Sequence, residues 1–225
     1  MRVHLGVPVL RRYDLLRELL LSAQAGTRRP GLTVVVDNGR RADRIAEALA
    51  GITLRVEVFA PAEPLGVAAS WNYLLRRLPE ERIIANDDVI FEPDSIEKIC
   101  ETAGDLIFGH GYSCFLMRDS ATEKIGFFDE AISPGYAYWE DIDYDMRVRL
   151  ACDRGVDFVQ ANAPCVVRHR GSQTNAVATS EEVLDHHRKF GIALHNMREK
   201  YRHLPFDQQH PTLQPHLRWP GRIEL

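Results

Sequence analysis

Short apolar runs alternate with amphipathic segments through the first hundred residues of the chain. The β-branched run 33–37 is apolar on both faces, which is typical of a buried parallel strand. Strands are predicted over 3–7, 33–37, 54–59 and 82–85, and helices over 14–24, 42–50, 66–77 and 93–103. This alternation predicts an α/β fold with a Rossmann-like, mostly parallel sheet that binds ligands at the carboxyl ends of its strands.

The regular alternation ends near residue 105. Beyond it, strands are predicted over 106–109, 112–117 and 156–160, and helices over 141–152 and 180–201. We therefore expect one domain over 1–204, in which 1–105 binds the main ligand and 106–204 forms a smaller second half. Residues 205–225 are rich in proline and histidine, and they predict an extended arm that lies on this subunit or joins a homodimer.

Composition narrows the class of protein. With 225 residues, 45% of them hydrophobic, the chain can bury a full core. A net charge of -4 excludes a protein that coats nucleic acid by electrostatics alone. The four cysteines form no CxxC pair, and no apolar stretch approaches the ~20 residues that cross a bilayer. These features favour a cytoplasmic protein, with peripheral association with a membrane left open.

Two acidic clusters carry the candidate chemistry. Asn86-Asp87-Asp88 directly follows the apolar strand 82–85, and Glu140-Asp141 opens the predicted helix 141–152. Neighbouring carboxylates after a buried strand repel one another and lose hydration, and a divalent cation removes that cost. The second cluster, if it lies across a cleft, is suited to hold a general base.

Seven short motifs, in order, cover most of the chain up to Thr174. They are Gly6-Val7-Pro8, Val36-Asp37-Asn38-Gly39, the segment 65–72 (LGVAASWN), Asn86-Asp87-Asp88-Val89, the segment 126–130 (GFFDE), the segment 138–144 (YWEDIDY) and the segment 169–174 (HRGSQT). Together they resemble the inverting glycosyltransferases of the GT-A fold, close to the rhamnosyltransferase-like members of family 2. The resemblance implies transfer of a hexosyl or deoxyhexosyl group from a UDP- or dTDP-sugar to an acceptor hydroxyl.

The resemblance also implies a set of donor-side residues. Asp88 and His169 match residues that bind Mn²⁺ or Mg²⁺ at the diphosphate. The donor itself is expected to contact Pro8, Val9, Asp37, Gly66, Asn72, Asn86, Asp87 and Arg170. Asp37 matches the residue that accepts a hydrogen bond from N3–H of uracil or thymine. The chain departs from the family pattern at Val9-Leu10-Arg11, where Arg11 is expected to meet a phosphate or the tail, and at Pro64.

On the acceptor side, the resemblance makes Asp141 the general base. Proton removal of this kind is typically worth about 10²–10⁴-fold in rate. Glu140, Trp139 and Tyr138 are expected to bind the acceptor, for which a saccharide or a glycolipid precursor is the family's usual substrate. Asp143 and Asp145 have a simpler explanation, because the helix dipole favours negative side chains near a helix N-terminus.

Two other functions remain open from the sequence. A nucleotidyltransferase shares this type of sheet and an aspartate-bound metal, but it usually carries a glycine-rich basic loop after the first strand, and residues 7–12 contain no glycine. A non-catalytic protein that binds nucleotide sugars is the second alternative, and the presence of both Asp88 and Asp141 speaks against it.

Overall fold

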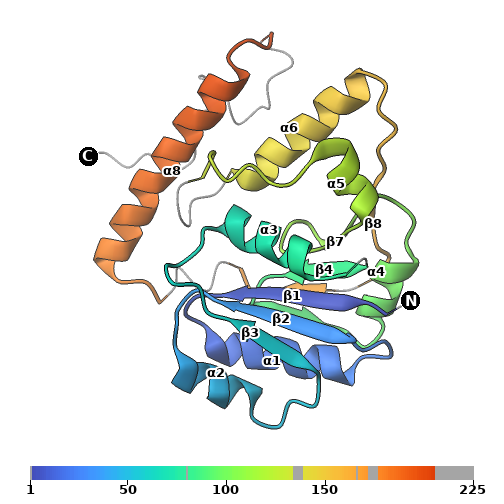
Figure 1. The fold of residues 1–225 in the computed structure, drawn as a ribbon, viewed down its shortest axis with the longest axis vertical. Coiled ribbons are helices and arrows are strands. Elements are labelled where there is room, and N and C mark those ends of the chain that lie inside the picture. The colour runs from blue at the N-terminus through green and yellow to red at the C-terminus, as the bar shows by residue number, and fades with distance from the viewer. Residues whose placement is uncertain (1, 80, 134–138, 166, 172–176, 206–225) are drawn as a thin grey trace.

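The structure is a computed structural model that describes residues 2–79, 81–133, 139–165, 167–171 and 177–205. Its centre is a seven-stranded sheet with helices on both faces (Figure 1). The strands of this sheet, in spatial order, are β3 (Val56–Phe59), β2 (Leu32–Asp37), β1 (His4–Val9), β4 (Arg82–Ala85), β7 (Cys114–Met117), β6 (Leu106–His110) and β8 (Gln160–Asn162). A second sheet pairs β5 (Val89–Phe91) with β9 (Val167–His169).

The strand directions confirm a mostly parallel α/β sheet. β1 pairs in parallel with β2 and with β4, and β2 pairs in parallel with β3. β7 is the exception, because it runs antiparallel to β4 and to β6. Every residue of β2 is buried, as its continuous apolar run predicts for an inner parallel strand.

Helices cover both faces of the sheet. They are α1 (Tyr13–Ala25), α2 (Ala42–Leu49), α3 (Val67–Arg77), α4 (Ser95–Glu101), α5 (Asp119–Ile125), α6 (Glu140–Asp153) and α8 (Ser180–Tyr201). Leucines of α1 pack with Leu5 and Val7 of β1 on one face, and Trp71 and Leu74 of α3 pack with β2 on the other. At Gly6, an added Cβ would lie 2.9 Å from Ile84 and 3.1 Å from Leu74, so glycine lets α3 pack closely on β1.

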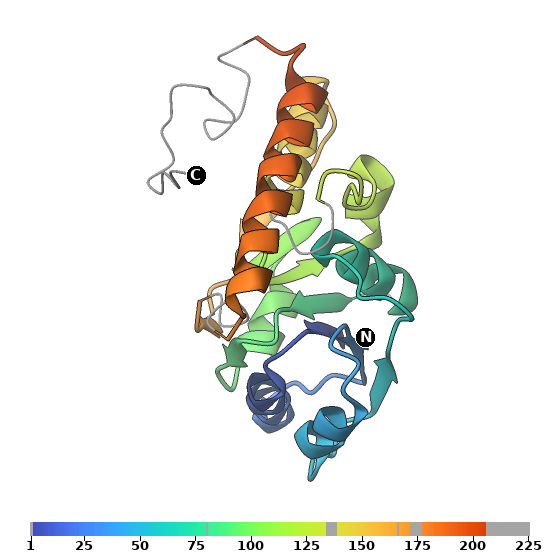
Figure 2. The same ribbon diagram turned by 90° about the vertical axis from the view of Figure 1, so that its left-hand side faces the viewer.

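The long helix α8 runs along one side of the molecule, from near the sheet toward α6 (Figures 1 and 2). Ala193 and Met197 of α8 form a third apolar cluster with Trp139 and Met146. Polar groups strengthen this contact, because the buried Asp143 carboxylate accepts hydrogen bonds from Lys200 Nζ at 2.6 Å and from the Tyr201 hydroxyl at 2.8 Å. In the part of the chain that the structure describes, no helix combines the length and apolar character needed to span a membrane.

The structure corrects the predicted elements mainly in the second half of the chain. The strand predicted over 156–160 is wrong: β8 begins at Gln160, because its pairing with β6 starts at Leu106 opposite that residue. Ahead of β8, the backbone N–H groups of Asp105 and Leu106 donate to Val159 O. The pattern also missed β5, β9 and α5, three short elements whose apolar residues number too few to show a period.

Candidate functional site

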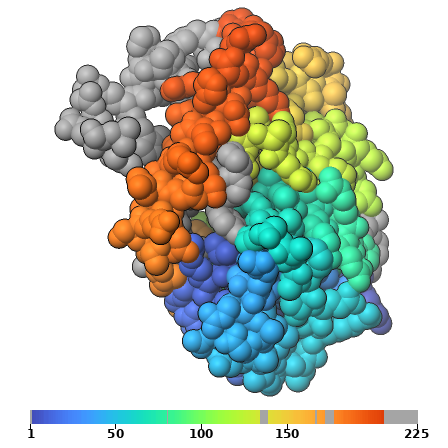
Figure 3. Space-filling view, turned by 60° about the vertical axis from the view of Figure 1, so that its left-hand side comes forward, coloured from blue at the N-terminus to red at the C-terminus, as the bar shows by residue number. Residues whose placement is uncertain are grey.

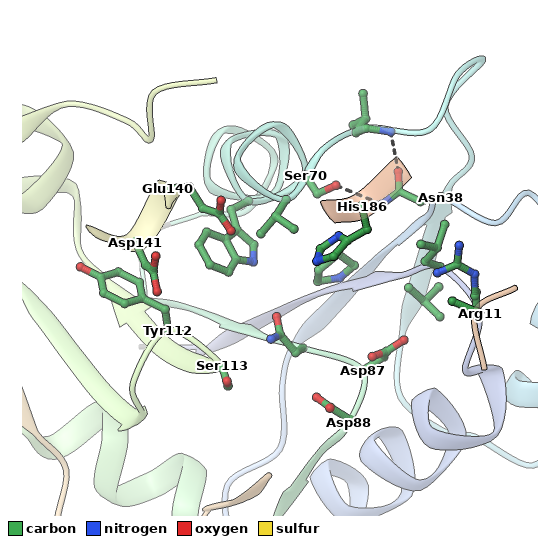
Figure 4. A pocket seen from close by; sticks show the side chains of 18 of the residues that line it. Arg11, Asn38, Ser70, Asp87, Asp88, Tyr112, Ser113, Glu140, Asp141 and His186 are labelled. Atoms are coloured by element: carbon green, nitrogen blue, oxygen red, sulfur yellow. Dashed lines mark hydrogen bonds between the residues drawn. The ribbon is translucent and has the colours of Figure 1, made fainter. Parts of the chain in front are cut away.

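A cavity of about 410 Å³ opens at the carboxyl ends of the central strands. Its lining includes residues that follow β1, β2 and β4, together with the start of α6 and the first turns of α8. Asp88 and Asp141, which are 53 positions apart in the chain, both line it (Figure 4). In the space-filling view a hollow lies beside the orange first turns of α8 (Figure 3). The fold thus brings the two predicted acidic clusters into one cavity.

The floor of the cavity is formed by the acids that follow β4. Burial, and then the neighbouring charge of Asp88, raise the pKa of Asp87 to about 8. Asp87 Oδ2 is buried and has no hydrogen-bond partner among the described residues. A buried carboxylate oxygen without a donor is costly, so this position suits a group that brings positive charge or a proton donor.

His169 reaches this floor through the small sheet. β5 and β9 are antiparallel, and their register sets Val89 opposite His169. As a result His169 Nε2 lies 3.1 Å from Asp88 Oδ1, and both side chains line the cavity. The two residues that the sequence assigned to a metal therefore lie in direct contact.

The donor set at the floor fits a divalent cation that is completed by a substrate. The protein contributes carboxylate oxygens of Asp87 and Asp88 and one imidazole nitrogen of His169. Among the described residues, no group of three or more His, Cys, Asp or Glu side chains is arranged to hold a metal by itself. Mg²⁺ and related ions are commonly held by one or two carboxylates together with substrate phosphates, so a partial protein set suits them.

The opposite end of the cavity is formed by the start of α6. Trp139, the residue before the helix, has a left-handed backbone with φ 96°, a conformation that a large side chain adopts only when its surroundings enforce it. Its indole packs on Phe190 of α8 at 5.1 Å between ring centroids. Trp139 is 4% exposed and is not among the described lining residues of the cavity, whereas Glu140 and Asp141 are.

Glu140 and Asp141 face different environments although they are adjacent. Burial, and then the charge of Asp141, raise the pKa of Glu140 to about 8. Ser133 forms a hydrogen bond with the Glu140 carboxyl group. The Oε2 atom of Glu140 has no partner among the described residues. Glu140 is therefore protonated at neutral pH, which leaves Asp141 as the better candidate for an ionised base at this end.

Aromatic side chains line the wall between the two acid pairs. Trp71 and Tyr112 both line the cavity, and their rings stack with centroids 6.2 Å apart. The Tyr112 hydroxyl donates to Asp145 Oδ1 at 2.6 Å, and burial raises the pKa of this phenol. This bond gives Asp145 a structural role. The sequence did not single out Tyr112, which it predicted as the first residue of the strand 112–117. In the structure β7 begins at Cys114, and Tyr112 lies in the short connection between β6 and β7.

The third region of the cavity lies at the ends of β1 and β2. Pro8, Val9 and Arg11 line it, as does Asn38. The Asn38 amide donates to Ser70 Oγ at 3.0 Å and accepts from the Leu65 backbone N–H at 2.8 Å, so it ties β2 to the start of α3 (Figure 4). Of the residues predicted to bind the donor, Pro8, Val9, Asn86 and Asp87 line the cavity.

Asp37 and Gly66 lie next to this region without being among its described lining residues. The buried Asp37 carboxylate accepts hydrogen bonds from the Tyr13 hydroxyl at 2.5 Å and from the backbone N–H groups of Arg40 and Arg41 at 2.9 and 3.0 Å. Asp37 therefore holds the loop that follows β2. Gly66 is the residue that precedes α3.

Asn72 and Arg170 have partners away from the cavity. The Asn72 amide accepts from Phe128 N–H at 3.0 Å and donates to Phe128 O at 2.9 Å and to Glu130 at 2.7 Å, so it anchors the turn over 126–130. Arg170 pairs with Glu18 of α1 and lines a neighbouring surface pocket, which shares His169 with the cavity. Neither is among the described lining residues of the main cavity.

The start of α8 supplies a wall that the sequence did not predict as part of the site. Glu182, Asp185, His186 and Lys189 line the cavity. The only local signal is the capping box Thr179-x-x-Glu182, which marks where the helix starts but not where it packs. Tyr138, the segment 172–174 and the tail beyond residue 205 lie outside the described residues, so their predicted roles stay predictions.

Comparisons with known proteins identify the fold. No protein-family model matches the chain, and no curated protein matches it in sequence. Solved structures do match. The mannosyltransferase PcManGT from Pyrobaculum calidifontis, in complex with GDP-Man and Mn²⁺, is 13% identical with a TM-score of 0.56, over 92% of this chain and 77% of that one. A glucosyl-3-phosphoglycerate synthase from Mycobacterium tuberculosis, with Mn²⁺, UDP and glucosyl-3-phosphoglycerate, is 16% identical with a TM-score of 0.56, over 87% and 79%.

A third match belongs to another enzyme class. The inositol-1-phosphate CTP transferase from T. maritima is 11% identical with a TM-score of 0.52, over 84% of this chain and 96% of that one. At such identities the likeness establishes the fold alone. The GT-A fold that the motifs predicted is thereby confirmed, and the activity has to be argued from the cavity.

Proposed function

We propose that this protein is a metal-dependent inverting glycosyltransferase that moves a sugar from a nucleoside diphosphate sugar to an acceptor hydroxyl. The observation that carries the proposal is the single cavity that joins the Asp87, Asp88 and His169 floor to Glu140 and Asp141 (Figure 4). Proteins of the same fold have been solved with GDP-Man or UDP and with Mn²⁺, which supports the same class of ligand here.

In this proposal Asp88 and His169 hold Mn²⁺ or Mg²⁺, with Asp87 beside them. When bound, the ion supplies a Lewis acid that stabilises negative charge on the departing nucleoside diphosphate. Two protein ligands leave coordination positions for phosphate oxygens, which makes cation and donor bind together. The unpartnered Asp87 Oδ2 is then available to a hydroxyl of the ribose or of the sugar.

Asp141 is the proposed base. The acceptor hydroxyl oxygen forms a bond to the anomeric carbon as its proton passes to the Asp141 carboxylate. The bond from that carbon to the diphosphate oxygen breaks, and its electron pair leaves with the nucleoside diphosphate, so attack from the opposite face inverts the anomeric centre. Glu140, protonated below its pKa of about 8, lies beside Asp141 as a neutral hydrogen-bonding group for the acceptor or sugar.

The proposed donor is a UDP- or dTDP-sugar that carries a hexosyl or deoxyhexosyl group. Its base end would lie against Pro8, Val9 and Asn38, over the loop that Asp37 holds. The proposed acceptor, a saccharide or glycolipid precursor, would enter at the end formed by Glu140 and Tyr112, which offers a carboxyl group and an aromatic surface to a sugar ring.

The proposal is tested by identifying which nucleotide product the protein releases. The protein is first screened by thermal shift against UDP-, dTDP-, GDP- and CDP-sugars with and without Mn²⁺, and each stabilising donor is then incubated with a panel of saccharide acceptors. Release of free nucleoside diphosphate supports sugar transfer. Release of pyrophosphate from nucleoside triphosphates would instead support nucleotidyl transfer, the second candidate that the likeness to the T. maritima enzyme favours. Binding without either product would indicate a non-catalytic binder.

A further inference from the structure

The first turns of α8 close the end of the cavity that lies beside β1 and β2. In the close view Glu140, Asp141 and Tyr112 lie at one end of the cavity and Asn38 and Arg11 at the other (Figure 4), and the charge of Arg11 acts on the His186 imidazole. His186 is half-buried and lines the cavity, and the next residue, His187, is exposed and is not among the described lining residues. Only one of the two adjacent histidines is thus turned toward the site.

Ion pairs hold α8 in this position at both ends. At its start, Glu182 accepts from Arg11 at 2.7 Å, so α8 is joined to the segment that follows β1. Hydrogen bonds from Thr179 and then Arg11 lower the pKa of Glu182 to about 2, so this pair stays charged at neutral pH. This ion pair gives Arg11 a partner on α8 that the sequence did not predict, while Arg11 still lines the cavity. At the far end, Lys200 bonds to buried Asp143.

The other charged α8 side chains in the cavity are already occupied by one another. Asp185 Oδ2 lies 2.6 Å from Lys189 Nζ, and Asp185 Oδ1 accepts from Arg188 at 3.1 Å. Burial, and then the nearby charges of His187 and Arg11, lower the pKa of His186. A neutral imidazole is therefore the form that this wall presents at neutral pH.

The chemistry at this end of the cavity suits a flat, uncharged heterocycle. The acids that would attract a cation lie at the floor, whereas this end combines the apolar side chains of Val9, Leu10 and Leu65 with the imidazole of His186. A neutral imidazole has one N–H donor and one acceptor nitrogen beside an aromatic face, and bases stack on such rings with little dependence on sequence.

We propose that His186 forms the cover of the nucleobase subsite and contacts the base of the bound nucleotide from α8. The inference rests on the proposed function, and it assigns to the second half of the chain a contact with the base, which the motifs place in the first half. In this proposal α8 takes part in donor binding. The nucleobase subsite then forms only when α8 is packed against α6 and bonded to Arg11.

The test separates contact with the base from contact with the phosphates. Binding of UDP, GDP and inorganic pyrophosphate, each with Mn²⁺, is measured by calorimetry for the wild type, His186→Ala, His186→Phe and the matched control His187→Ala. We expect His186→Ala to bind the preferred nucleoside diphosphate about tenfold more weakly, the size of one lost stacking contact, with pyrophosphate affinity unchanged. His186→Phe keeps the ring and is expected to retain most of the affinity, and His187→Ala all of it.

Two results would overturn the inference while leaving the proposed function intact. One is nucleotide affinity of His186→Ala equal to that of the wild type, and the other is an equal loss for pyrophosphate, which would place the imidazole on the phosphates. A wild-type protein that binds none of these nucleotides with Mn²⁺ would overturn the proposed function, and this inference with it. Unfolding temperatures of the four proteins show whether each variant is folded.

Discussion

The two acid pairs of the cavity share one arrangement but are held in place by different means. In each pair the first acid is buried with a pKa raised to about 8 and one oxygen without a partner, and the second acid lines the cavity beside it. Asp87 and Asp88 follow β4 and are stabilised by the pairing of β5 with β9. Glu140 and Asp141 begin α6 after the left-handed Trp139, which packs on α8.

This difference shows what each half of the site depends on. The Asp87–Asp88 pair is placed by hydrogen-bonded strands. The register of β5 with β9 fixes where His169 lies relative to Asp88. The Glu140–Asp141 pair depends on a contact with a helix some fifty residues later in the chain, so its geometry follows the packing of α8. We therefore expect changes in the first pair to alter ligand binding, and changes around the second to alter catalysis and stability together.

The largest effect is expected for Asp141→Asn. If Asp141 takes the acceptor proton, its loss lowers the rate of transfer by about 10²–10⁴-fold while donor affinity stays within a few-fold. Initial rates and calorimetric donor binding give the two numbers. Asp153→Asn, at the exposed end of the same helix, is the control for removing one charge from α6. Transfer by Asp141→Asn at near the wild-type rate would show that the base lies elsewhere.

The second prediction concerns the floor. Asp88→Ala removes the carboxylate that contacts His169, and we expect it to abolish the gain in nucleoside diphosphate affinity that Mn²⁺ gives the wild type, on the order of tenfold or more. Calorimetry with and without Mn²⁺ measures this gain. Glu101→Ala, an exposed acid in α4, should behave as the wild type. If Mn²⁺ increases the affinity of Asp88→Ala as much as that of the wild type, the metal does not bind at Asp88.

The third prediction tests how α8 supports the second pair. Lys200→Met leaves the buried Asp143 with Arg147 and Tyr201 but without its ammonium partner, so we expect the free energy of unfolding to fall by about 2–3 kcal/mol. Urea unfolding measures the loss. Arg202→Met, in the same last turn but exposed, should cost about 0.5 kcal/mol or less. If both variants are equally stable, the buried network does not anchor α8.

The smallest effect is expected from Glu140→Gln, and it depends on pH. The pKa of Glu140 is about 8 in the folded protein against an ordinary value of 4.5, so the folded state binds the extra proton between these values. Stability of the wild type should therefore fall as pH rises from 4.5 to 8 and level off above 8. Because Gln does not titrate, the variant should lack this part of the fall.

Unfolding temperatures at pH 5 and pH 8.5 measure the contribution of Glu140. Relative to the wild type, Glu140→Gln should gain several degrees in unfolding temperature between these two pH values, because it lacks the carboxyl group whose titration destabilises the wild type. Glu123→Gln, an exposed acid in α5, should follow the wild type at both. Parallel pH profiles for Glu140→Gln and the wild type would show that this carboxyl group titrates normally.

Much of the fold could be predicted from the sequence because its signals are local. The apolar run of β2, the strand ahead of Asp87 and the full extent of α8 all follow from periodicity and end signals. The short strands β5 and β9 could not be predicted in this way, because each has three residues and exists through the other. Without these two strands, the sequence gives no geometric reason to place His169 beside Asp88, and only the resemblance to the family linked the two residues.

The site residues also fall into two groups, those that a local sequence signal selects and those that only tertiary packing identifies. Asp88 and Asp141 could be selected because acids of this kind follow a buried strand or open a helix, features visible in the chain itself. Asp37 and Asn38 are adjacent and both buried, and only the tertiary structure separates their roles: Asp37 holds the loop after β2, whereas Asn38 lines the cavity. His186 and His187 present the same problem on α8.

The sequence by itself determined the α/β alternation, the edge of the sheet where ligands bind and the two acidic clusters, because strand and helix periods and like-charge repulsion act between near neighbours. Only the tertiary structure decided that Asp88 and Asp141 share one cavity, that burial raises the pKa of Glu140, and that α8 lines the same cavity. Burial and cavity shape arise where segments distant in the chain pack together, and no local pattern encodes which side chain faces the space between them.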